Sequence, residues 1–213
     1  ELPSLQHVIC LGSDSDDLPA GTHALTTMMT AEGQPHVPVP PVAADPMLLL
    51  YTSGTSASPK AVPHTYQTIL SNAHAGVAEH GIASEDILLS AAPLSHLYGL
   101  YSFHLALAAG ATTLLLPAFT PPDLANVIEQ GYPTLLFTAP AHIGAAMQLG
   151  VFENRDLSSL RQTILSGSTC PPELFPAFQA LAPQNTLGQL WGMTEAQAGL
   201  YTRPHDDAQV AAY

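Results

Sequence analysis

Positive charge is scarce in this sequence. Only four of its 213 residues are lysine or arginine, against 17 aspartates and glutamates, and the formal net charge is −13 at pH 7. So few basic groups cannot neutralise a run of phosphates, which argues against nucleic acid and anionic membrane surfaces as partners. We therefore expect any bound anion to be held mainly by backbone dipoles.

Cysteine motifs, metal-binding motifs and long apolar runs are missing as well. The two cysteines, Cys10 and Cys170, lack C-x-x-C spacing and fit neither a disulfide framework nor a zinc site, so we expect two buried thiols. The ten histidines form no H-x-H or H-E-x-x-H arrangement, which argues against a transition-metal site. Without a signal peptide or an apolar run of membrane-spanning length, the sequence predicts a cytoplasmic protein with no membrane span.

Apolar residues are abundant instead. They make up 46% of the chain and charged residues only 10%, so we expect a folded chain with one main core. Short runs rich in Leu, Ile and Val alternate with longer amphipathic stretches, a pattern typical of buried strands and helices. This pattern predicts an α/β fold with a doubly wound, mostly parallel sheet and flanking helices. Ligands of such sheets bind beyond the carboxyl ends of the strands.

The same patterns give the expected elements by residue number. Strands are expected at residues 5–11, 47–51, 87–90, 112–116, 134–137, 163–165 and 186–190. Helices with a proline near the start or a glycine near the end are expected at residues 63–79, 97–107, 121–130 and 171–181. A further helix of small residues is expected at residues 141–149.

Prolines divide the chain. Residues 31–46 contain five of them, a density that blocks regular structure and is typical of a connector. We therefore predict a small N-terminal piece and connector over residues 1–40 and an α/β domain over residues 41–213. The last ten residues contain no helix or strand stop signal, so we expect this domain to be incomplete at its C-terminal end.

A polar loop follows the strand expected at residues 47–51. It consists of Thr52, Ser53, Gly54, Thr55, Ser56, Ala57, Ser58, Pro59 and Lys60. Small hydroxyl residues after a strand can surround a phosphate with N–H and O–H donors, and a cation completes the charge. A mobile surface loop is the alternative. The preceding strand and the fact that Lys60 is the only lysine of the chain favour phosphate binding.

This loop is not the G-x-x-x-x-G-K-[ST] nucleotide loop, because no Gly-Lys-Ser/Thr follows Gly54 at the required distance. It resembles the phosphate loop of the adenylate-forming superfamily, which includes acyl-CoA synthetases, luciferases and peptide-synthetase adenylation domains. The family pattern is Tyr/Phe-Thr-Ser-Gly-Thr-Thr-Gly-x-Pro-Lys-Gly, and residues 51–55 and 59–60 match it. Ala57 and Ala61 replace family glycines, and a Cβ costs about 1 kcal/mol or more where φ is positive or backbone approaches phosphate.

A second motif, at residues 188–195, is similar to the family's Tyr-Gly-x-Thr-Glu segment, with Trp191 in the place of tyrosine. The resemblance implies that Trp191 stacks near adenine, Thr194 touches the α-phosphate and Glu195 positions Mg²⁺. The residue types suit these roles, because an aromatic face suits a purine and a hard carboxylate suits magnesium. A core tryptophan and a solvated carboxylate are the alternative.

Residues 166–174 look like the strand-end loop that reads Ser-Gly-Gly-Ala-Pro in the family and lies against adenine and the acyl group. Ser166, Gly167 and residues 172–174 match, whereas residues 168–170 depart from the pattern. The resemblance implies an acyl contact for Ser166. It implies adenine contacts for Gly167, Ser168, Thr169 and, from the second motif, Gly192.

Two more segments resemble the acyl pocket of the family. Residues 93–100 are similar to its Pro-Leu-x-His-x-x-Gly segment, in which the histidine lies beside the carboxylate and the thiol tunnel. Residues 134–140 resemble its Thr-x-x-x-x-Val-Pro stretch, with Ala139 in place of valine. The resemblance therefore implies acyl-pocket roles for His96, Tyr98, Gly99, Thr134 and Pro140. A lone histidine at a helix start can instead be a cap.

The resemblance implies an enzyme that binds ATP, CoA and a small carboxylic acid, with Mg²⁺ as cofactor. The acid attacks the α-phosphorus to give acyl-AMP, and a thiol then takes the acyl group to give acyl-CoA, with Thr194, Glu195 and His96 as catalytic residues. A medium-chain, alicyclic or aryl acid is expected, bordered by residues 98–107 and 141–149. Peptide-synthetase domains usually have a Phe-Asp segment in place of the histidine segment, which disfavours an amino-acid substrate.

Several family segments are not found in the sequence. The ribose-binding Thr-Gly-Asp segment, the hinge and the C-terminal domain with its lysine are missing, so we expect a fragment of a longer enzyme that is inactive alone. Two alternatives stay open. One is an adenylating enzyme with another acyl acceptor, such as a carrier protein or oxygen, and the other is a non-catalytic nucleotide- or acyl-binding relic.

Overall fold

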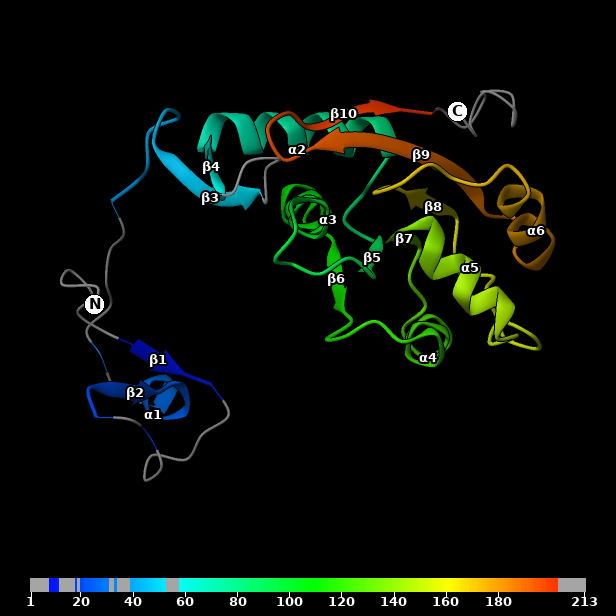
Figure 1. The fold of residues 1–213 in the computed structure, drawn as a ribbon, viewed down its shortest axis with the longest axis horizontal. Coiled ribbons are helices and arrows are strands. Elements are labelled where there is room, and N and C mark those ends of the chain that lie inside the picture. The colour runs from blue at the N-terminus through cyan, green and yellow to red at the C-terminus, as the bar shows by residue number, and fades with distance from the viewer. Residues whose placement is uncertain are drawn as a thin grey trace. The chain divides into compact units, whose positions relative to one another are not determined.

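The computed structural model describes residues 8–11, 18, 20–30, 33, 39–52 and 58–202 (Figure 1). The chain forms two compact units, Glu1–Pro40 and Pro41–Tyr213. In the first unit, strands β1 (Val8–Cys10) and β2 (Thr22–Ala24) pair in parallel, and helix α1 (Leu25–Thr30) follows them. The assignment of the two units as functional domains stays a prediction.

A six-stranded sheet forms the centre of the second unit, in the order β10-β9-β8-β7-β5-β6. Its strands are β5 (Ile87–Ser90), β6 (Thr112–Leu115), β7 (Leu135–Thr138), β8 (Gln162–Leu165), β9 (Thr186–Met193) and β10 (Gln197–Tyr201). Neighbouring strands are parallel except for the antiparallel pair of β9 and β10. The expected α/β fold with a mostly parallel sheet is therefore confirmed.

Helices cover both faces of this sheet. They are α2 (Tyr66–His80), α3 (Leu97–Ala109), α4 (Pro121–Gly131), α5 (Pro140–Gln148) and α6 (Leu174–Leu181). Side chains alternate between the faces of a strand, so Leu88 and Leu135 pack with residues of α2 and α3. Leu89 and Leu136 pack with residues of α4, α5 and α6 on the other face.

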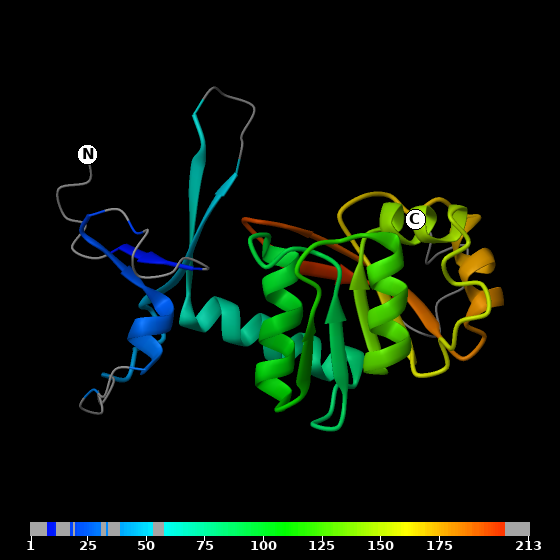
Figure 2. The same cartoon turned by 90° about the horizontal axis from the view of Figure 1, so that it is seen from below.

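An antiparallel hairpin precedes α2. Its strands are β3 (Pro46–Thr52) and β4 (Lys60–Thr65), which run side by side and lead into the helix (Figure 2). Residues 47–51 do form a strand, but the prediction that this strand is buried was wrong. β3 pairs with β4 instead of joining the main sheet. Leu49 and Tyr51 are accordingly 52% and 66% exposed.

Two predicted helix starts were wrong by three residues. The helix expected from Pro63 begins at Tyr66, because Pro63 pairs with Leu49 in the hairpin and Thr65 provides the N-cap. The Thr65 hydroxyl accepts a hydrogen bond from the Thr68 amide, which ends the strand and starts the helix. The helix expected from residue 171 begins at Leu174.

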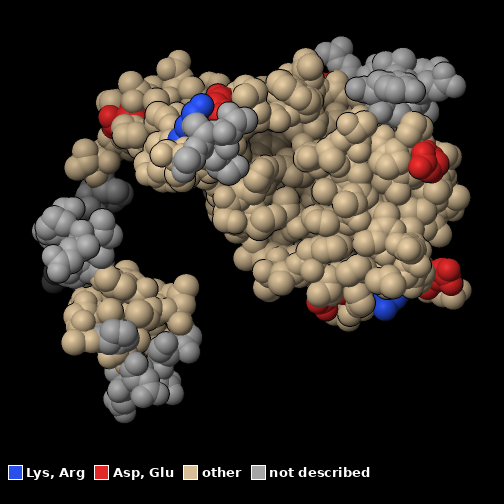
Figure 3. Space-filling model, in the orientation of Figure 1, with Lys and Arg blue, Asp and Glu red and all other residues tan. Residues whose placement is uncertain are grey.

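Charged side chains are sparse on the face drawn in Figure 3, as the composition implies. Within the described residues, no helix is long and apolar enough to cross a membrane.

The connections leaving β5 and β7 turn to opposite faces of the sheet. The chain leaves β5 for α3 on one face, and it leaves β7 for α5 on the other face. β6 lies on one side of β5, and β7 lies on its other side. The strand order therefore reverses between β5 and β7. A crevice at the carboxyl ends of the strands is expected at such a reversal.

Candidate functional site

Two cavities lie beyond the carboxyl ends of β8 and β9. The larger cavity has a volume of about 730 Å³ and is lined by residues 166–169, 189–192 and 200–202. The smaller cavity, of about 530 Å³, is lined by Thr52, the first two turns of α3, residues 166–167 and residues 190–198 in part. Both include Ser166, Gly167, Leu190 and Gly192 in their walls, so they are neighbours.

The larger cavity brings together all the residues predicted to contact adenine, namely Gly167, Ser168, Thr169, Trp191 and Gly192. Gly167 has a φ of 94°, a left-handed conformation that favours glycine and lets the chain turn sharply after β8. The Trp191 side chain is 56% exposed, so its ring is accessible to a flat ligand. These features suit a purine.

The smaller cavity brings together Thr52, His96, Tyr98, Thr194 and Glu195 from three separate segments. His96 is also the N-cap of α3, because its Nδ1 accepts a hydrogen bond from the Tyr98 amide at 3.1 Å. This bond fixes the ring and makes Nε2 the nitrogen that can meet a ligand. His96 therefore caps the helix and also lines the cavity, although the cap and the functional position were predicted as alternatives.

Two tyrosines of α3 form an aromatic wall of the smaller cavity. The Tyr98 hydroxyl donates to the Ile164 carbonyl at 2.7 Å, and the Tyr101 hydroxyl shares a 2.8 Å hydrogen bond with the Tyr201 hydroxyl. Burial raises the pKa of Tyr98 and of Tyr101 well above the ordinary value, so both phenols stay neutral at physiological pH. The wall is thus rigid and uncharged.

The predicted phosphate loop connects the two strands of the hairpin. Thr52 and Lys60 form its last pair, and Thr52 lines the smaller cavity. Lys60 is exposed at the start of β4. The remaining predicted loop residues, Ser53, Gly54, Thr55 and Ser56, lie outside the described residues.

Three residues predicted for the acyl pocket line neither of the two cavities. Thr134 precedes β7 at the amino edge of the sheet, opposite the cavities, and its hydroxyl donates to the Asp86 carboxylate at 2.6 Å. Gly99 packs against Pro93, whose carbonyl oxygen would lie 2.3 Å from an added Cβ. Pro140 is buried in the first turn of α5. None of the three lines either of these two cavities, and their assignment to an acyl pocket stays a prediction.

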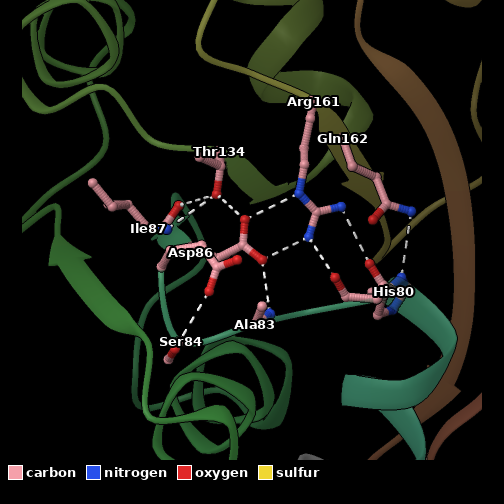
Figure 4. A network of polar contacts seen from close by, with 10 residues as sticks. His80, Ala83, Ser84, Asp86, Ile87, Thr134, Arg161 and Gln162 are labelled. Carbon is pink, nitrogen blue, oxygen red and sulfur yellow. Dashed lines mark hydrogen bonds and ion pairs between the residues drawn. The ribbon is translucent and has the colours of Figure 1, made fainter.

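Thr134 instead belongs to a polar network at the amino edge of the sheet (Figure 4). Asp86 accepts hydrogen bonds from Thr134 and from Arg161, whose Nη2 lies 2.8 Å from Oδ2. Burial alone would raise the pKa of Asp86, but hydrogen bonds from Arg161, Thr134 and a backbone amide outweigh it and lower the pKa from 3.8 to about 2. The Asp86–Arg161 ion pair and its hydrogen bonds therefore stabilise the amino edge of the sheet, which lies opposite the cavities.

Sequence reasoning missed several residues of the site. Tyr101 follows Tyr98 at a spacing that places both on one helix face, so this wall could have been found from the sequence. Tyr201 comes from β10, which the sequence pattern did not predict. His64 lies in a strand that was taken for a helix, and it contacts the backbone of Thr194 across 130 positions of sequence.

Comparisons with known proteins agree with this geometry. A family model described as "AMP-binding enzyme" matches residues 2–212. The chain is 34% identical over 170 residues to 4-coumarate–CoA ligase 2 of Oryza sativa subsp. japonica, covering 74% of this chain and 29% of that protein. It is 31% identical over 214 residues to a feruloyl-CoA synthase of Amycolatopsis sp, covering 93% of this chain and 43% of that protein.

A solved structure of the anthranilate CoA ligase AuaEII with anthranoyl-AMP is also similar. It has a TM-score of 0.88 and 25% sequence identity, and the match covers 97% of this chain and 40% of that one. The chain thus spans less than half the length of these relatives. The resemblance to the adenylate-forming superfamily is confirmed, and the chain belongs to the AMP-binding enzyme family.

Proposed function

We propose that this chain provides the nucleotide- and acid-binding face of a longer, ATP-dependent acid–CoA ligase. The observation that carries the proposal is the pair of neighbouring cavities. The larger one gathers the residues assigned to adenine, and the smaller one gathers His96, Thr194 and Glu195. A nucleotide in the first cavity would therefore direct its phosphates toward groups suited to phosphate and carboxylate in the second.

In the proposed reaction, a carboxylate oxygen of the acid attacks the α-phosphorus of ATP. The new oxygen–phosphorus bond forms as the bond to the β-phosphate bridge breaks, which gives acyl-AMP and pyrophosphate. The thiol of CoA then attacks the acyl carbon, loses its proton and releases AMP. Catalysis rests on positioning and on neutralising negative charge rather than on a covalent enzyme intermediate.

Each residue has a role that follows from its place. The Thr194 hydroxyl would donate to the α-phosphate, and His96 Nε2 would donate to the acid. Thr52, Lys60 and the loop between them would hold the β- and γ-phosphates, with Lys60 supplying the positive charge. Ser166, which lines both cavities, would lie where adenylate and acyl group meet.

Glu195 suits a magnesium ion bound with ATP. Among the described residues, no three His, Cys, Asp or Glu side chains gather as a metal site. A single carboxylate at the cavity nevertheless fits Mg²⁺, which commonly takes one or two carboxylates together with substrate phosphates and water. When bound, the ion would neutralise charge on the phosphates.

An aromatic acid is the substrate class that the site favours. Tyr98 and Tyr101 offer aromatic surface to the smaller cavity, and a planar ring packs well against such side chains. The volume of about 530 Å³ accommodates a small acid and limits a long chain. Several relatives described above are named for aromatic acids, which supports the same choice.

Pyrophosphate release tests the proposal. The full-length enzyme would be assayed with ATP, Mg²⁺ and a panel of aromatic, alicyclic and medium-chain acids, with and without CoA, beside the 213-residue chain alone. We expect aromatic acids to have the highest kcat/KM, CoA to be acylated, and the chain alone to be inactive. The ligase assignment would be refuted if pyrophosphate were released without any acid, or if no acyl-CoA formed when CoA was present.

A further inference from the structure

A buried histidine lies against the turn that joins β9 to β10. His64 is the fifth residue of β4 and is only 4% exposed. Its Nε2 lies 2.7 Å from the backbone carbonyl oxygen of Thr194, and its Nδ1 lies 3.3 Å from the side-chain amide of Gln197. The ring therefore contacts both ends of the segment that carries Glu195.

The two contacts fix the proton on the ring. A carbonyl oxygen can only accept, so Nε2 of His64 donates to Thr194. Nδ1 is then the acceptor and receives a hydrogen bond from the Gln197 amide. The neutral ring with its proton on Nε2 satisfies both partners at once, which an aliphatic side chain of similar size cannot do.

The turn itself is tight and partly strained. Ala196 donates its amide to the Met193 carbonyl at 3.1 Å, and Gln197 has a φ of 59°, a left-handed conformation that is uncommon outside glycine. A Cβ added at Gly192 would lie 2.4 Å from the Gln197 carbonyl oxygen. Such a conformation persists only where the surroundings hold it, and the His64 ring is one such support.

We infer that His64 is a positioning residue that sets the Thr194–Glu195 segment for adenylation, an inference that rests on the roles proposed for these two residues. The hydrogen bond to the Thr194 carbonyl orients the peptide that joins Thr194 to Glu195. The same strand begins at Lys60, so His64 also joins the strand that ends the phosphate loop to this turn. His64 thereby couples β4, the strand that follows the phosphate loop, to the turn that carries Thr194 and Glu195.

Three variants of the full-length enzyme separate the contacts. His64→Leu removes both hydrogen bonds, His64→Asn can reach only the Nδ1 position, and His64→Gln can place an N–H near the Nε2 position. We expect Leu and Asn to lower the kcat of pyrophosphate release about tenfold or more and to raise the Mg²⁺ concentration needed for half-maximal rate. The KM for the acid should change less than about twofold. His64→Gln should restore most of the rate.

His80→Leu is the matched control. His80 is also a buried histidine, at the other end of α2 and at the amino edge of the sheet, where its Nδ1 contacts the Gln162 amide. We expect this variant to lose stability while its kcat and Mg²⁺ requirement stay those of the wild type. If His64→Leu does not fold, the comparison of His64→Asn with His64→Gln decides the question.

Two further variants keep the inference separate from the proposed function. If Thr194→Ala and Glu195→Gln leave adenylation unchanged, the proposed function fails whatever His64 does. If these two slow the reaction but His64→Leu and His64→Asn keep the wild-type kcat and Mg²⁺ requirement, the inference is overturned and the proposed function stands. Hydrogen exchange gives a readout independent of turnover: the Ala196 amide should exchange faster in His64→Leu.

Discussion

Arg161 connects three elements at the amino edge of the sheet, and its replacement should destabilise the second unit. Its guanidinium donates to both oxygens of Asp86, at 3.0 and 2.8 Å, and to the carbonyls of His80 and Gly81 at 3.3 and 3.0 Å. These contacts join the start of β8, the strand β5 and the end of α2 (Figure 4). Arg161→Met keeps much of the aliphatic side chain and removes all the donors.

The expected loss of stability comes from the groups that Arg161 contacts. Asp86 is only 6% exposed, so the change leaves a buried carboxylate without its cation. The lowering of its pKa from 3.8 to about 2 corresponds to roughly 2 kcal/mol. The two carbonyls at the end of α2 lose donors worth about 0.5 to 1.5 kcal/mol each. Because the Arg161 side chain is 40% exposed and the hydrogen bonds from Thr134 and Ala83 to Asp86 remain, we expect a loss at the lower end of this sum, roughly 2 to 3 kcal/mol.

Urea unfolding at pH 7, followed by circular dichroism, measures this loss in the 213-residue chain. The control is the double variant Asp86→Asn/Arg161→Met, which has no buried charge. The single amide oxygen of the asparagine can accept from the Ala83 amide, and its NH2 group can donate to the Thr134 hydroxyl. We expect the double variant to be more stable than Arg161→Met alone. A loss under about 1 kcal/mol for the single variant, or a double variant that is no better, would refute the reasoning.

Three further predictions concern single residues. Burial lowers the pKa of His80 from 6.5 to about 4, so between these pH values the unfolded chain binds a proton that the folded chain does not. The free energy of unfolding should fall by up to about 3 kcal/mol from pH 6.5 to 4, and His80→Leu should flatten this slope in unfolding at a series of pH values. In the full-length enzyme, Lys60→Ala should raise the KM for ATP more than that for the acid, and unchanged ATP kinetics would contradict its role. Glu195→Gln should slow adenylation about a hundredfold, and a rate within about twofold of the wild type would contradict its assignment.

The sequence predicted the central strands β5, β7 and β8 well because they are buried on both faces. Runs such as residues 87–90 and 163–165 are mostly apolar, and proline and glycine mark the helices between them. Residues 47–51 have the same apolar character but pair with β4. Strand partners are chosen by tertiary contacts, so a local pattern could not separate a hairpin from a central strand.

The site was predicted through motifs rather than through geometry. Motif positions that follow the carboxyl ends of strands, such as Gly167 and Thr194, do line the cavities. Thr134 opens a motif whose later residues cross the sheet, so its place at the amino edge could not be read from the motif alone. The contact of His64 with Thr194 spans 130 positions, and no spacing rule reports a contact of that kind.

The basic residues that the structure describes differ in whether a carboxylate already pairs with them. Of the three basic residues that the structure describes, Arg155 pairs with Glu129 and Arg161 pairs with Asp86. The third, Lys60, lies on the loop assigned to phosphate. Among the described residues, a phosphate chain bound as proposed would therefore rely on Lys60, backbone donors and a bound cation, because Arg155 and Arg161 are already paired with carboxylates. Substitutions at the amino edge should accordingly change the free energy of unfolding and spare kcat. Substitutions at Thr194 or Glu195 should lower kcat at nearly constant stability, and those at the buried His64 should lower both kcat and stability.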